Sequence, residues 1–175
     1  MCEMATDYPI YEPSRQCSTC KGKCCQRIPG HYSPADFSDL SFEALKTKIE
    51  KGNIAIDWWT DDGRKEYYLR ARHHGENIVH GSWGGVCVNL SPAGCRLAWE
   101  ERPLSCRNLK PRESSRGDCL GSYTKEICKN DWKEHAEVLN QLVAYFGKQE
   151  SPIEELMGGL VEALKMFTGN VEVSE

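Results

Sequence analysis

The sequence of 175 residues contains no apolar run that approaches the length of a membrane span. Its first residues also lack the basic and apolar regions of a secretory signal peptide. We therefore expect a cytoplasmic protein in a reducing compartment, where persistent disulfides are uncommon. The sequence has neither a nucleophile elbow nor a phosphate-binding loop, so it does not support an enzyme whose side chains alone carry the catalysis.

A large excess of charge of one sign is also missing. The formal net charge is -4, and acidic and basic residues are interspersed. This balance excludes a broad basic footprint for nucleic acid and a membrane-surface patch, so we expect neither partner. Hydrophobic residues make up 39% of the chain, and the mean hydropathy is -0.59. A chain with this modest supply of core-forming residues gains stability from bonds made through cysteine.

Cysteine is the residue that the chain has in abundance, with ten in all. A small chain rarely uses so many unless their sulfur atoms bind a metal or another sulfur. Cys2 stands alone at the start. The other nine are candidate metal ligands: Cys17, Cys20, Cys24, Cys25, Cys87, Cys95, Cys106, Cys119 and Cys128.

The first cysteines form the motif Cys17-x2-Cys20-x3-Cys24-Cys25. Two thiolates in a Cys-x2-Cys segment can turn onto one metal, which is why zinc and iron–sulfur sites both use it. The side chains of Cys24 and Cys25 diverge from the backbone, so a polynuclear cluster takes both, two sites share them, or one is a bystander. Because a tetrahedral ion needs four ligands, we expect a site that joins this segment to the middle of the chain.

The identity of the metal is less constrained. The chain lacks the second Cys-x2-Cys knuckle of a zinc ribbon and the four-cysteine run of bacterial ferredoxins. Cysteine ligation suits both metals, and the adjacent cysteines favour an iron–sulfur cluster, [4Fe–4S] in particular, with zinc as the alternative. A disulfide framework is a third interpretation. The missing signal peptide and the adjacent cysteines argue against it. Among the histidines, His73-His74 is predicted to be a solvated pair.

The pattern of the remaining residues predicts a small α+β domain with an irregular, cysteine-rich centre. A helix is expected to begin at Ser33-Pro34 and to end near Gly52, and the acidic turn at 61–64 predicts a β-hairpin. Two short strands are expected at 86–90 and 94–97, and C-terminal helices from 125 onward with stops at Gly147 and Gly169. The domain prediction is an extended segment over 1–16, a metal-binding domain over 17–130, helices packed on it over 131–168 and a flexible tail over 169–175.

Together with Cys87-Val-Asn-Leu, Gly94-Cys95-Arg96-Leu97 and Arg102-Pro103-Leu-Ser-Cys106-Arg107, the first motif resembles the zinc- or iron-chelating cysteine-cluster family, called CxxCxxCC or YkgJ-like. The resemblance covers roughly residues 17–130 and implies metal or iron–sulfur binding. The family has two residues before its double cysteine where this chain has three. Members carry a further cysteine before a closing helix, a role for which Cys119 and Cys128 compete.

Three arginines flank the later cysteines, namely Arg96, Arg102 and Arg107. Guanidinium groups there would offset the negative charge of a thiolate-bound metal or cluster. Alternatively, Arg102-Pro103 marks a turn and Arg107 pairs with Glu100 or Glu101. Two functions remain open: a redox or metal-dependent protein that works through its cluster, and a zinc-stapled module whose surface binds a protein partner.

Replacing Cys20 or Cys106 with serine is expected to lower both the metal content and the stability, because each removes a ligand that joins segments of the chain. Cys2→Ser is expected to change neither. Elemental analysis and thermal unfolding of the three variants check this expectation. Equal metal loading in all three would contradict the ligand assignment.

Overall fold

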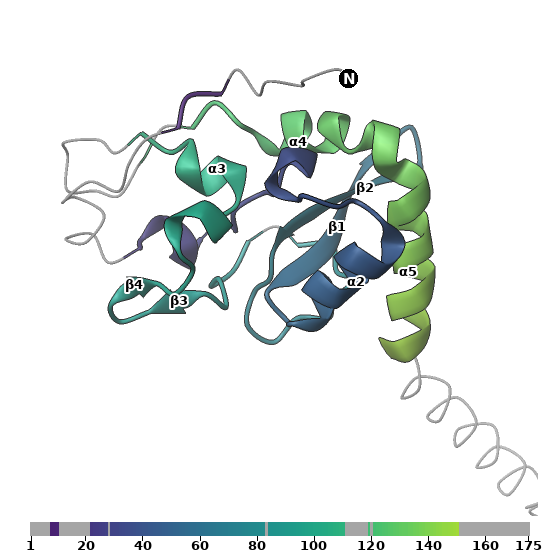
Figure 1. Ribbon diagram of the computed structural model, residues 1–175, viewed down its shortest axis with the longest axis horizontal. Helices are drawn as coiled ribbons and strands as arrows, with labels where there is room; N and C mark the ends of the chain where they lie inside the picture. Colours follow the sequence, from purple (N-terminus) through teal and green to yellow (C-terminus); the bar gives the residue numbers. More distant parts are fainter. Residues whose placement is uncertain are drawn as a thin grey trace, which may run out of the picture.

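The structure is a computed structural model that describes residues 8–10, 22–27, 29–82, 84–110, 119 and 121–150. Its helices and antiparallel strand pairs confirm the predicted α+β class. In Figure 1 the hairpin of β1 (Ile54–Asp61) and β2 (Arg64–Ala71) lies between helix α5 (Ala136–Glu150) on one side and the short helix α3 (Leu104–Arg107) on the other. Among the described helices, none is both long enough and apolar enough to cross a membrane.

The hairpin forms where the sequence predicts it. Its register pairs Ile54 with Ala71 at the open end and Asp61 with Arg64 at the turn. The two turn residues Asp62 and Gly63 both have positive φ, at 50° and 78°. An Asp-Gly pair favours this tight two-residue connection because its twist matches that of the strands.

The expected helix from Ser33 to Gly52 is instead two separate elements. Ser33 does cap a helical turn, η2 (Pro34–Asp36), through a reciprocal capping box with Asp36. The backbone then becomes extended at Phe37, and Ser41 caps a new helix, α2 (Phe42–Glu50). The two capping serines therefore divide the expected helix into two elements, since each fixes its own helix start.

The second pair of strands is shorter than predicted, with β3 (Leu90–Ser91) and β4 (Gly94–Cys95). The residues just before β3 form backbone hydrogen bonds with other segments instead. Cys87 N donates to the carbonyl of Cys25 at 2.8 Å, and Val88 N donates to that of Arg72 at 2.9 Å. A short 3-10 turn, η3 (Trp99–Glu101), leads from β4 to α3.

The C-terminal helical region starts at α4 (Lys125–Asp131), continues through η4 (Lys133–His135) and runs on as α5. Gly147 does not end α5, because the helix continues to Glu150. The expected last helix, with its stop at Gly169, lies outside the described residues, as does the predicted tail at 169–175. Of the predicted lead-in at 1–16, residues 8–10 are described and have no regular secondary structure.

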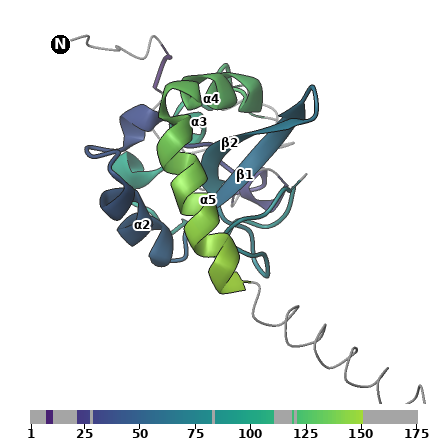
Figure 2. The same ribbon diagram turned by 90° about the vertical axis from the view of Figure 1, so that its right-hand side faces the viewer.

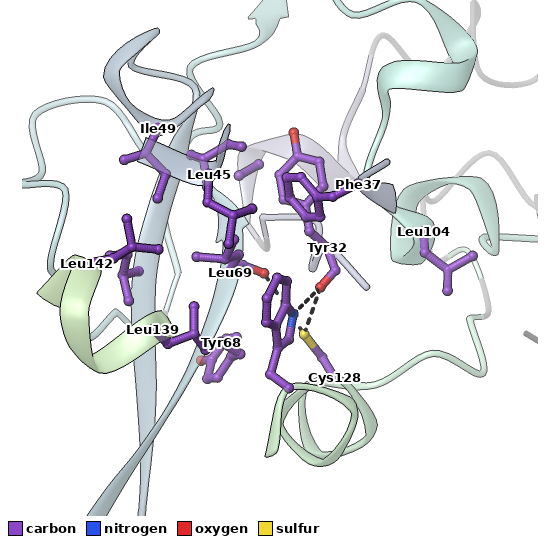
Figure 3. Close-up of a cluster of buried hydrophobic side chains, with 14 of the residues drawn as sticks. Tyr32, Phe37, Leu45, Ile49, Tyr68, Leu69, Leu104, Cys128, Leu139 and Leu142 are labelled. Atoms are coloured by element: carbon purple, nitrogen blue, oxygen red, sulfur yellow. Dashed lines mark hydrogen bonds between the residues drawn. The ribbon is translucent and has the colours of Figure 1, made fainter. Parts of the chain in front are cut away.

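One hydrophobic core joins the hairpin to the helices. Figure 2 shows α5 lying across the hairpin, with α2 beside it. Figure 3 shows Leu45 and Ile49 of α2, Leu69 of β2, and Leu139 and Leu142 of α5 in one cluster. All five are fully buried, and burial of each such side chain contributes roughly 1.5–3 kcal/mol. Residues 136–150 thus belong to the same packed body as the hairpin.

A charged group also lies inside this body. The guanidinium of Arg70, 1% exposed, donates from Nε to Asp57 Oδ2 at 2.7 Å. It also donates from its two terminal nitrogens to both carboxylate oxygens of Glu76, at 2.6 and 2.9 Å. Because all three side chains are buried, removal of one partner would leave uncompensated charge in a medium of low polarity.

Arg70→Met is therefore expected to lower the free energy of unfolding by about 3–5 kcal/mol, since it removes the buried cation that pairs with two buried carboxylates. Arg64→Met is the matched control, because Arg64 is exposed on the same strand. We expect the control to change stability by less than about 0.5 kcal/mol. Urea unfolding followed by circular dichroism gives both values, and equal stabilities would show that the buried ion pairs do not hold the hairpin.

Candidate metal centre

The first cysteine segment is positioned by the edge of β2. Tyr32 N donates to the carbonyl of Leu69 at 2.9 Å, and Ala71 N donates to that of Gly30 at 2.7 Å. Residues 30–32 therefore extend the hairpin as a short third partner on the side opposite β1. The 3-10 turn η1 (Cys24–Gln26) lies just before them and carries Cys24 and Cys25.

The second cysteine segment follows the continuation of β2. His74 N donates to the carbonyl of Val86 at 2.9 Å, which places Cys87 in a β-bridge with His73. Cys87 N then donates to the carbonyl of Cys25 at 2.8 Å. The two cysteines are thus neighbours although 62 positions (87 minus 25) separate them in the sequence.

The third segment is α3, which carries Cys106. Ser105 N donates to the carbonyl of His31 at 3.2 Å, and His31 N donates to Ser105 Oγ at 2.6 Å. The sulfur of Cys106 lies directly over Gly30, where an added Cβ would come within 2.2 Å of it. Glycine at position 30 therefore lets α3 approach the first segment closely enough to bring in its cysteine.

The thiols interact with one another in this arrangement. The sulfurs of Cys24 and Cys25 are 3.9 Å apart, and the hydrogen bond between them lowers the pKa of Cys24 to about 6. The same bond, followed by burial, raises the pKa of Cys25. Burial raises the pKa of Cys106. A thiolate at that position would also be repelled by charge on Cys24, Cys87 and Cys95, so the five sulfurs share one electrostatic environment.

A cation is the natural partner of such a group. Several buried thiols ionise together only when a bound metal compensates their charge, and soft thiolates select zinc, copper(I) or iron–sulfur clusters. Within the described ranges, no three or more cysteine, histidine or acidic side chains already have the spacing of a formed metal site. Cys17 and Cys20 lie outside those ranges, as does Cys2.

A cavity of about 690 Å³ opens beside these cysteines. Cys24, Cys25 and Cys106 line it, and so does Cys119 from the segment before α4. His31 forms part of its wall and is buried, which lowers the pKa of its imidazole to about 4. The ring is therefore neutral at pH 7. In the sequence, only the position of His31, six residues after Cys25, gives a weak indication that it belongs to the site.

Cys128 lies elsewhere, in the hydrophobic core. Its sulfur donates to the carbonyl of Tyr32 at 3.3 Å, and Figure 3 shows the two residues together. The indole nitrogen of Trp132 donates to the same carbonyl at 2.7 Å. Burial raises the pKa of Cys128 well above its usual range, and its leading charged neighbours are aspartates. The structure thus brings Cys119, and not Cys128, to the cavity.

The three arginines have different environments. Arg102 acts electrostatically on the thiols, because its charge lowers the pKa of Cys24 and opposes the rise at Cys106. Arg107 forms an ion pair with Asp36, a residue far away in the sequence, rather than with Glu100 or Glu101. Arg96 is exposed beside Cys95 at the end of β4.

The prediction that His73 and His74 form a solvated pair is wrong for His73, which is 4% exposed, although His74 is exposed. The carboxylate of Glu76 accepts a hydrogen bond from His73 N at 2.6 Å and lies 3.3 Å from its Nδ1. Glu76 is itself paired with Arg70. The ion pairs of the core therefore extend to His73, which forms a β-bridge with Cys87.

Comparison with protein families gives one match. Residues 16–136 match a family named CxxCxxCC and described as "Putative zinc- or iron-chelating domain". The comparisons with curated proteins and with solved structures give no match. The matched range contains every cysteine except Cys2, and it takes in the three segments that converge beside the cavity. The chain belongs to the CxxCxxCC family, whose described role is the chelation of zinc or iron.

Proposed function

We propose that the chain is an iron–sulfur protein whose cluster is held by cysteines of the three converging segments. The observation that carries the proposal is the shared environment of Cys24, Cys25, Cys87, Cys95 and Cys106, which is more thiols than one tetrahedral ion accepts. Cys119 at the cavity, with Cys17 and Cys20 of the first motif, would bring the set to eight. We leave Cys128 out of this set because it lies in the core.

The cavity supports a working role for the cluster. A site that serves only to staple a fold is closed, whereas electron transfer, sensing or cluster-assisted chemistry needs access for a partner or a small molecule. Here the thiols of Cys24, Cys25 and Cys106 line a cavity of about 690 Å³. Arg102 would offset part of the negative charge of the bound centre and so tune the cluster without binding it.

A zinc-stapled module that binds a protein partner is the second candidate, and one distance favours it. Four sulfurs at about 2.3 Å from a tetrahedral zinc lie roughly 3.8 Å from one another. The sulfurs of Cys24 and Cys25 are 3.9 Å apart, which fits two ligands of a single ion. In a [4Fe–4S] cluster each iron takes one cysteine, so its ligands lie farther apart.

Iron, zinc and acid-labile sulfide per chain distinguish the two candidates. The protein is purified without oxygen and without a metal-affinity column. We expect about four iron atoms per chain with matching sulfide, together with visible absorption that bleaches on reduction. One or two zinc ions without iron would establish the second candidate instead. A chain without either metal would contradict both.

Paired substitutions test the ligand set. Cys106→Ala is expected to lower the metal content per chain sharply, because it removes a thiolate from the centre. Cys128→Ala is expected to leave the metal content unchanged and to lower the free energy of unfolding by about 1–2 kcal/mol, through lost packing and a lost hydrogen bond. Elemental analysis and urea unfolding give the two quantities. Cys128→Ala also destabilises the fold, so it controls for metal that is lost through instability alone. If Cys128→Ala lost metal, Cys128 would return to the ligand set.

A further inference from the structure

Two buried side chains next to Cys87 have hydrogen-bonding groups without a partner. Within the part of the chain that the structure describes, His73 Nε2 and Asn89 Nδ2 are the buried side-chain nitrogens that form no hydrogen bond. Both residues are 4% exposed. His73 lies opposite Cys87 in a β-bridge, and Asn89 follows Cys87 by two positions. Buried polar groups are nearly always paired, so two unpaired nitrogens beside one cysteine indicate that an acceptor or a ligand is still to be bound there.

The backbone around Asn89 is fixed on both sides. Leu90 N donates to the carbonyl of Cys87 at 3.0 Å, which closes a tight turn that contains Asn89. The carbonyl of Asn89 accepts from Arg96 N, just beyond β4, at 2.8 Å. In a turn of this kind, a polar side chain at the first position can accept from the backbone N–H two residues on. The turn therefore directs Asn89 N toward the side chain of Cys87.

Asn89 acts on the thiol of Cys87 through its backbone and through its side chain. Burial raises the pKa of Cys87, and hydrogen bonding from the backbone and the side chain of Asn89 opposes that rise. Charge on Cys95 and Cys24 raises this pKa further. A neutral thiol is a weak acceptor, whereas an ionised acceptor forms a strong hydrogen bond. The amide of Asn89 is thus in place for a thiolate and is not used by the neutral thiol.

The ring of His73 has partners elsewhere. Its Nδ1 lies 3.0 Å from Ser82 Oγ and 3.3 Å from Glu76 Oε2. The ring also packs on the backbone of Gly85, where an added Cβ would come within 2.9 Å of the same nitrogen. His73 is not among the leading influences on the pKa of Cys87. Asn89, rather than His73, is therefore the residue whose unpaired donor is directed at the sulfur.

We propose that Asn89 is a positioning residue of the metal centre, which donates from its backbone and side-chain N–H groups to the sulfur of Cys87 when that sulfur binds the metal. A metal-bound cysteine is a thiolate, so metal binding supplies the acceptor that the buried amide lacks. Partners of this kind orient metal ligands and tune the metal. The proposal deepens the proposed function and rests on it, because it requires Cys87 to be a ligand.

Hydrogen bonds of this kind act on the reduction potential of an iron–sulfur cluster. The reduced cluster carries one more negative charge than the oxidised cluster, and its sulfurs are therefore the stronger acceptors. N–H groups that donate to Cys87 stabilise the reduced form more than the oxidised form. Asn89 is thus expected to raise the reduction potential of the centre.

Two variants of similar size separate the donor from the shape of the side chain. Asn89→Leu removes the side-chain donor, Asn89→Asp replaces it with a carboxylate that repels the sulfur, and both keep the backbone N–H. We expect Asn89→Leu to lower the ratio of reduced to oxidised cluster at a fixed potential about tenfold, which is a shift of about 59 mV for one electron. Asn89→Asp is expected to lower it further. Redox titration without oxygen, followed by visible absorption, gives the potentials.

Cys128→Ala is the control, because it changes a buried residue of the core and lowers stability without touching the centre. We expect its potential to equal that of the unchanged chain. Asn89→Ser is smaller and keeps a hydroxyl donor, so it is expected to shift the potential less than Asn89→Leu does. It also keeps the test decisive if leucine does not fit. Potentials of the Asn89 variants that equal those of the control would overturn the proposal.

Metal analysis of the same samples separates this proposal from the proposed function. Iron with sulfide but unchanged potentials would contradict the role of Asn89 alone. Zinc without iron would contradict the iron–sulfur assignment, and the role of Asn89 is then measured on the cobalt(II)-substituted chain. There we expect the sulfur-to-cobalt charge-transfer absorption to move to lower energy in Asn89→Leu, because the thiolate loses a donor. Unchanged absorption would overturn the proposal, and a chain that binds no metal would overturn both.

Discussion

The backbone at the edge of β2 is the constraint on which the cysteine cluster depends. The main chain of Gly30–Tyr32 pairs with one end of the strand, and that of Val86–Val88 pairs with its continuation at 72–74. Each pairing delivers a cysteine-bearing segment to the same place, and the hydrogen bond from Cys87 N to Cys25 O joins them. These bonds are made by backbone groups, so the segments need no apolar side chains of their own to be positioned.

Charge lies inside the protein both in the core and at the cysteine cluster, and it is balanced differently at these two places. In the core, the cation of Arg70 is fully paired with the carboxylates of Asp57 and Glu76. At the cysteine cluster, the largely half-buried cysteines have only Arg102 as a cation among the leading influences on the pKa of Cys24 and Cys106. Thiolates gathered with so little compensation repel one another, and a bound metal removes that repulsion.

A cavity lies beside the cysteines of the converging segments. Cysteines form one wall, whereas a basic wall comes from η1 and from the start of α4. Because α4 also supplies Cys128 and the helical region supplies Trp132 to the core, the position of the basic wall is tied to the packing of the whole domain.

The sequence alone determined the chemistry of the site and the local elements. The double cysteine with its Cys-x2-Cys partner indicated metal chelation, the Asp-Gly turn specified the hairpin, and Ser33 fixed a helix start, because each signal lies within a few neighbouring residues. Only the tertiary structure decided which distant residues meet. It placed Cys119 at the cavity and Cys128 in the core, paired Arg107 with Asp36, and buried His73 behind Glu76. Those outcomes depend on how the segments fold over the hairpin, and spacing along the chain carries no information about that.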